Sequence, residues 1–166
     1  EKREVMDGFK FERLEVWQLS LEYLDLCYAV AERLPKQEEY NLKAQLIRAG
    51  TSIALNVAEG STSQSDPEQA RFLGFALRSL IETVACRRVA QQRTYVNAED
   101  AMLTKIEQLG QKLFAKLQAM RHSLIDKVEG SSGSSRPSSV SGQQSPVIRR
   151  RSPVPPPTSG LSRMSP

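Results

Sequence analysis

The chain has 166 residues, of which 39% are hydrophobic and 25% charged, and it carries a net charge of +4. This length suits one domain with appendages, and two cysteines are too few for a disulfide framework. No apolar run approaches the roughly 18 residues that a membrane helix needs, so we expect a cytoplasmic protein without a membrane segment.

The composition divides the chain near residue 129. Residues 130–166 contain 12 Ser, 7 Pro and 4 Gly, which bury too little apolar surface to offset the entropy of ordering. Residues 1–128 have no net charge, so the excess positive charge lies beyond them. We therefore expect an extension over 1–10, a folded domain over 11–128 and a disordered basic tail over 129–166. Such a tail suits weak attraction to nucleic acid or a solubilising role.

The first two predicted helices cover residues 12–34 and 38–60. In each of them, apolar residues recur at spacings of three and four, which is the helical period. Pro35 separates the two helices, and Gly60 is a plausible C-terminal stop for the second.

The third predicted helix begins at Asp66-Pro67, where an Asp cap precedes a proline, and it continues to about Thr94. The fourth begins near Asn97, a favourable cap, and continues to about Lys127. Four long helices with short connections predict an all-α fold, an antiparallel up-down-up-down four-helix bundle.

A polar row runs beside the apolar seam of the second helix. Its members are Gln45, Arg48, Asn56 and Glu59, which are predicted to face Ser79 and Glu82 of the third helix. Such a row resembles an active site, but buried polar groups also fix helix register. Because no suitable nucleophile or general base stands nearby, we interpret the row as a structural polar seam and predict that the protein is not an enzyme.

Neither a metal nor a cofactor site is predicted. Di-iron bundles need Glu-x-x-His pairs on facing helices, yet the only histidine is His122, and position 119 is alanine. The sequence also lacks the glycine-rich loops that cradle phosphates.

The third helix is the basic element of the domain. Residues 71–93 hold five arginines against one acid, whereas residues 12–34 hold two arginines against five acids. One hypothesis is that Arg71, Arg78, Arg87 and Arg88 contact nucleic-acid phosphates across an assembled surface. The alternative is that these arginines pair with acids of the first helix, within or between subunits.

Residues 52–60, with the sequence SIALNVAEG, resemble the signature of the four-helix-bundle proteins of 23S ribosomal RNA intervening sequences. That superfamily includes the accessory variability determinant of diversity-generating retroelements. Residues 11–17, 40–49 and 72–82 also resemble the family, in order, and the likeness spans about residues 11–125. Ala54 stands where the family commonly has proline, so the second helix should be straighter here.

The resemblance implies a homopentamer around a central channel. In retroelement members it also implies a basic surface that engages a reverse transcriptase and RNA, whereas intervening-sequence members have no established activity. We therefore expect a non-catalytic oligomeric scaffold that binds RNA or DNA and a partner protein. The alternative is a structural or interaction bundle of the same family with no nucleic-acid role.

Overall fold

The computed structural model describes residues 8–97 and 99–132. Its elements are η1 (Lys10–Arg13), α1 (Glu15–Glu32), η2 (Lys36–Glu38), α2 (Leu42–Ser61), α3 (Asp66–Gln92) and α4 (Ala101–Ser132), where η denotes a short 3-10 helix. No strand occurs among these residues. The prediction of an all-helical fold with four long helices is confirmed.

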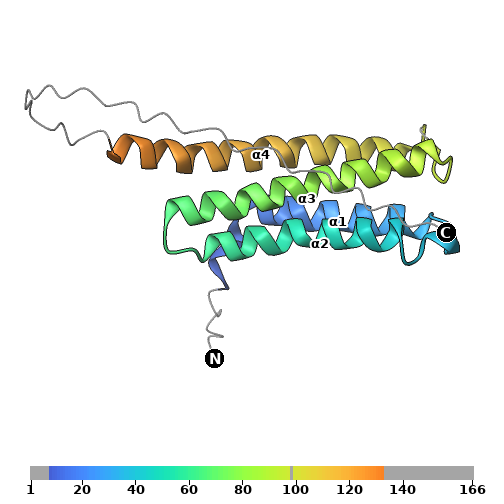
Figure 1. The fold of residues 1–166 in the computed structure, drawn as a ribbon, viewed down its shortest axis with the longest axis horizontal. Coiled ribbons are helices and arrows are strands. Elements are labelled where there is room, and N and C mark those ends of the chain that lie inside the picture. Colours follow the sequence, from blue (N-terminus) through green and yellow to red (C-terminus); the bar gives the residue numbers. More distant parts are fainter. Residues whose placement is uncertain (1–7, 98, 133–166) are drawn as a thin grey trace, which may run out of the picture. The chain divides into compact units, whose positions relative to one another are not determined.

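The four long helices pack side by side along one direction (Figure 1). Helix α1 packs on α2, α2 on α3, α3 on α4, and α4 back on α1. Helices α1 and α3 are not among the packed pairs, so they lie across the diagonal of the bundle. The outer face of α1 and the outer face of α3 therefore belong to opposite sides of the domain.

Three helices begin later than the sequence predicts, because a tight turn precedes each of them. Lys10–Arg13 and Lys36–Glu38 form 3-10 turns, so α1 begins at Glu15 and α2 at Leu42. Before α4, the Asp100 carboxylate accepts the backbone N–H of Met102 at 2.8 Å. Asp100 is therefore the cap of α4, and the predicted cap Asn97 instead accepts the N–H of Glu99 at 3.1 Å in the preceding turn.

The predicted cap of α3 is wrong by one residue. The Ser65 hydroxyl, not the carboxylate of Asp66, accepts the N–H of Glu68, at 3.4 Å. Gly60 does not end α2 as the sequence predicts, because the helix continues through it to Ser61. A Cβ at Gly60 would lie 2.9 Å from the Cβ of Phe72, so glycine here permits close approach of α3.

Helix α4 extends to Ser132, so residues 129–132 belong to the helix and not to the predicted tail. The rest of the predicted tail, residues 133–166, lies outside the described residues, as do residues 1–7 of the predicted extension.

The core is formed by apolar residues that recur at helical spacing on the inner face of each helix. In α4 the buried positions include Ile106, Leu113, Leu117 and Leu124. Tyr23 of α1 is fully buried, and its hydroxyl lies 2.8 Å from the hydroxyl of Thr83 on α3. This hydrogen bond joins the two diagonal helices through the centre of the bundle.

Candidate nucleic-acid interface

Two of the predicted arginines lie exposed on the same face of α3. Arg71 and Arg78 are seven residues apart, which is about two helical turns, and half-buried Phe75 lies between them. The guanidinium carbon of Arg71 is 5.6 Å from the centre of the Phe75 ring. That of Arg78 is 6.0 Å from the same centre. The negative face of the ring attracts both cations and so offsets their mutual repulsion.

Helix α4 adds a third arginine, Arg121, which the sequence reasoning missed. Its Nε–H donates to the carbonyl of Ala70 at 3.2 Å, which orients the guanidinium beside Gly74. Together Arg71, Arg78 and Arg121 line a surface hollow of about 310 Å³. None of the three forms an ion pair with a residue in 8–97 or 99–132. We call this set the arginine cluster.

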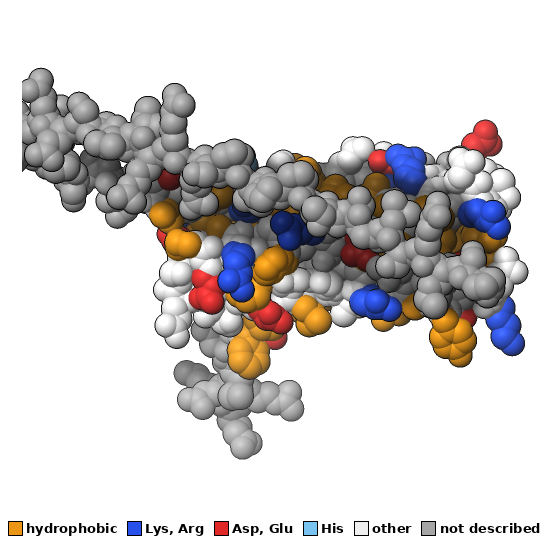
Figure 2. Space-filling model, viewed as in Figure 1, with side chains coloured by type: hydrophobic (Ala, Val, Ile, Leu, Met, Phe, Trp, Pro, Cys, Tyr) orange, Lys and Arg blue, Asp and Glu red, His pale blue; other side chains and the backbone are white. Residues whose placement is uncertain are grey.

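On the side of the domain that Figure 2 shows, the positive side chains do not form one broad basic face. Figure 2 shows Lys and Arg side chains interspersed with acidic and hydrophobic ones on the visible side of the domain. The arginine cluster is therefore a local concentration of positive charge in a domain whose residues 1–128 carry no net charge.

Arg87 does not belong to this surface, which corrects its predicted role. Its side chain is 2% exposed, forms an ion pair with Glu107 of α4, and donates to the carbonyl of Leu103 at 3.5 Å. Its guanidinium is therefore already engaged by groups of α4. The sequence carried a signal for this burial, because Arg87 follows core residues Leu73 and Leu80 at intervals of seven.

Arg88 is exposed but also binds Glu107, with its nitrogen 3.2 Å from the carboxylate oxygen. Among the described residues, these two arginines therefore pair with α4 and not with α1, the helix named in the alternative hypothesis. The hydrogen bond from Arg87 lowers the pKa of Glu107, and the positive charge of Arg88 acts in the same direction.

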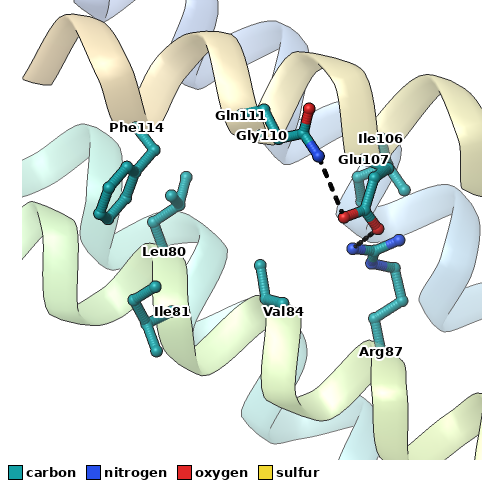
Figure 3. A pocket seen from close by; sticks show the side chains of 9 residues that line it. All are labelled: Leu80, Ile81, Val84, Arg87, Ile106, Glu107, Gly110, Gln111 and Phe114. Carbon is teal, nitrogen blue, oxygen red and sulfur yellow. Dashed lines mark hydrogen bonds and ion pairs between the residues drawn. The ribbon is translucent and has the colours of Figure 1, made fainter.

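The Arg87–Glu107 pair borders an apolar pocket between α3 and α4. Figure 3 shows Arg87 reaching from α3 toward Glu107 at one end, and Phe114 at the other. Ile81 and Val84 of α3 line the stretch between them. Gln111, on the same helix as Glu107, donates to the Glu107 carboxylate at 3.5 Å. The carboxylate therefore has partners on both α3 and α4.

The predicted polar seam is only partly assembled. Gln45 of α2 donates to the carboxylate of Glu82 on α3, and the Ser79 hydroxyl donates to the Ser52 hydroxyl at 3.0 Å. Asn56 instead donates within its own helix, to the carbonyl of Ser52 at 2.7 Å.

The two remaining residues of the predicted seam lie apart from it. Arg48 and Glu59 are both exposed, and neither side chain forms an ion pair with a described residue. The six predicted residues therefore do not converge on one reactive centre. Two of their contacts link α2 to α3, which is the geometry of a register-fixing seam.

The cysteine thiols sit in positions that suppress their reactivity. Burial raises the pKa of Cys27 to about 12 and also raises the pKa of Cys86. Both thiols are therefore protonated at neutral pH, whereas the thiolate is the nucleophilic form. Among residues 8–97 and 99–132, no group of three His, Cys, Asp or Glu side chains is placed to hold a metal ion, and His122 is exposed.

The described fold places the chain in the class of all-helical bundle proteins. A family model described as "23S rRNA-intervening sequence protein" matches residues 12–115. Because the match covers more than half of the chain, the protein belongs to this family. A comparison with curated proteins found no match. None of the described helices is both long enough and apolar enough to cross a membrane.

Proposed function

We propose that this protein is a non-catalytic, oligomeric helical scaffold that binds nucleic acid through the arginine cluster and also binds a partner protein. The observation that carries the proposal is the convergence of Arg71, Arg78 and Arg121 on one hollow without an acidic partner among the described residues. Guanidinium groups match phosphate oxygens geometrically and remain charged at every physiological pH. Three of them in one place favour a polyanion as the ligand.

The proposed partner is the reverse transcriptase of a diversity-generating retroelement, for which this chain would be the accessory protein. Membership of the intervening-sequence family and the resemblance of residues 52–60 support this choice. In this role several copies, five by the resemblance, would pool their arginine clusters and hold template RNA beside the polymerase in the cytoplasm.

The proposed scaffold is an up-down-up-down bundle with antiparallel sequence neighbours. Four residues, 62–65, connect α2 to α3, and they span at most about 14 Å. A crossover along the 27 residues of α3 would need about 40 Å. The connection is therefore long enough for a turn between antiparallel helices and too short for a return along the bundle.

The test compares two triple variants that remove the same amount of positive charge. Arg71→Ala/Arg78→Ala/Arg121→Ala deletes the arginine cluster. The control, Arg48→Ala/Lys105→Ala/Lys112→Ala, deletes three cations from exposed positions elsewhere. Binding to a labelled single-stranded RNA is measured by fluorescence anisotropy across a salt series.

We expect the wild-type affinity to fall steeply with salt, because bound phosphates release counterions. Deleting the cluster should lower the slope of log K against log salt by about two, and the control by much less. Equal changes of the salt slope in the two triple variants would contradict the assignment of nucleic-acid binding to the arginine cluster. Absence of binding by the wild type at every salt concentration would favour the second candidate.

That second candidate is a structural or interaction bundle of the same family without a nucleic-acid role. The observation in its favour is the zero net charge of residues 1–128, which gives the domain no long-range attraction for a polyanion.

A further inference from the structure

The outer face of α1 combines large apolar side chains with acids. Leu21 and Tyr28 are 37% and 45% exposed, and their spacing of seven places them on one face. Exposed Asp25 lies between them, and Glu22 and Glu32 are exposed beside them. None of these three acids forms an ion pair with a described residue.

The outer face of α3 has the same pattern with the opposite charge. Ile81 and Val89 are 54% and 49% exposed, and exposed Ala85 lies midway between them at spacings of four. Arg78, which also belongs to the arginine cluster, is exposed one turn before Ile81, and Arg88, which pairs with Glu107, is exposed beside Val89. The row from 81 to 89 is about 12 Å long, close to the roughly 10 Å between residues 21 and 28 of α1.

These two faces cannot cover one another within one chain. Helices α1 and α3 lie across the diagonal of the bundle, so their outer faces point to opposite sides. Each face leaves two large apolar side chains in water, at a cost that burial against a partner would relieve.

We propose that the α1 face of one copy packs against the α3 face of a second copy of this chain. This inference rests on the oligomer in the proposed function and specifies its contact. Opposite charges select this pairing, because α1 against α1 would bring acids together and α3 against α3 would bring arginines together. The apolar rows supply the contact area, and the charges set which faces meet.

The contact is heterologous, since a different surface of each copy takes part. A pair of copies keeps one free α3 face on the first copy and one free α1 face on the second, so further copies add until a ring closes. Arg71 lies ten residues, or about 15 Å along α3, before Ile81. The contact therefore leaves Arg71 and Arg121 open for the nucleic acid, whereas Arg78, three residues before Ile81, borders both surfaces.

The first test places a charge in the proposed contact and compares it with a control of equal exposure. Ile81→Lys puts a lysine in the α3 row, whereas Leu55→Lys changes a side chain on α2 that is 53% exposed and lies outside both faces. The mass of the full chain is measured by light scattering over a concentration series, with circular dichroism to verify folding. Ile81→Lys should weaken association by about tenfold or more, and Leu55→Lys should leave it unchanged.

A charge-exchange pair tests the same contact independently of the apolar row. Glu22→Lys/Asp25→Lys makes the α1 face basic, and Ala85→Glu/Arg88→Glu makes the α3 face acidic. Neither variant should associate with itself, but their mixture should form assemblies in which the two variants alternate.

The results separate this contact from the proposed function. An assembled wild type whose mass is unaffected by Ile81→Lys, or variants that fail to assemble when mixed, would overturn the α1–α3 contact alone. A wild type that stays a single chain would overturn the contact and the oligomer together. Loss of RNA binding by the Arg71→Ala/Arg78→Ala/Arg121→Ala variant bears on the nucleic-acid role alone when that variant keeps the wild-type mass, because Arg78 borders both surfaces.

Discussion

Arg87 of α3 and Glu107 of α4 form an ion pair in which the arginine side chain is 2% exposed and the glutamate side chain 31%. The Nε–H of Arg87 has no hydrogen-bond partner, so the guanidinium depends on Glu107 and on the carbonyl of Leu103 for its solvation. A buried charge without its partner is strongly destabilising. The pair therefore joins α3 to α4 at a point where the apolar pattern alone would place a leucine.

Glu107→Gln should lower the free energy of unfolding by about 3 kcal/mol, because it leaves Arg87 buried without a counter-charge. The measurement is urea denaturation followed by circular dichroism. Glu59→Gln is the matched control, since Glu59 is exposed and forms no ion pair with a described residue, and it should cost less than about 0.5 kcal/mol. Equal losses in the two variants would show that the buried pair has no special role.

The contribution of Glu107 to the free energy of unfolding should decrease as the pH falls into the acid range. The pKa of Glu107 in the folded chain is lowered from its usual 4.5, chiefly by the hydrogen bond from Arg87. A lowered carboxyl pKa stabilises the fold at pH values above 4.5, and this stabilisation is lost as the pH falls through the folded-state pKa. The stability difference between wild type and Glu107→Gln should therefore be constant near neutrality and shrink in acid. A difference that grows in acid would contradict the ion pair.

Tyr23→Phe should destabilise the fold by about 1 kcal/mol, because it removes the buried hydrogen bond to Thr83. The loss is moderate since the Thr83 hydroxyl also lies 2.6 Å from the carbonyl of Leu80 and keeps that partner. Tyr40→Phe is the control, as Tyr40 is 96% exposed. Thermal denaturation of both variants compares their melting temperatures. An unchanged melting temperature for Tyr23→Phe would show that the Tyr23–Thr83 hydrogen bond does not stabilise the fold.

Two glycine-to-alanine substitutions should change stability in opposite directions. At Gly74 an added Cβ would meet only the Nε of Arg121 at 3.4 Å, so alanine should stabilise α3 by about 0.5–1 kcal/mol. At Gly60 the added Cβ would lie 2.9 Å from the Cβ of Phe72, so alanine should destabilise the α2–α3 contact by about 1–3 kcal/mol. Denaturation midpoints that move the same way in both variants would refute this difference.

The periodicity of apolar residues predicted most of the fold. Leu113 and Leu117 are fully buried because the same spacing that makes α4 helical also places them on its inner face. Local turn chemistry was harder to predict, since Ser65 and Asp66 are both good caps and only the backbone geometry decides between them.

The candidate site was less predictable because its members depend on packing between helices. Arg71 and Arg78 could be placed on one face by their spacing alone. Arg121 is far from them in the sequence, and only the docking of α4 on α3 brings it to Ala70. The interval of seven residues after Leu80 predicts that Arg87 lies in the core, whereas its charge predicts a surface position. Arg87 is buried because Glu107 supplies a counter-charge there.

The most direct test of the central claim is the mass of the purified full chain in solution, measured by sedimentation with and without single-stranded RNA. The account predicts an assembly of several copies that becomes heavier when RNA is added, and no such gain after deletion of Arg71, Arg78 and Arg121. A single chain whose mass does not change with RNA would contradict the account.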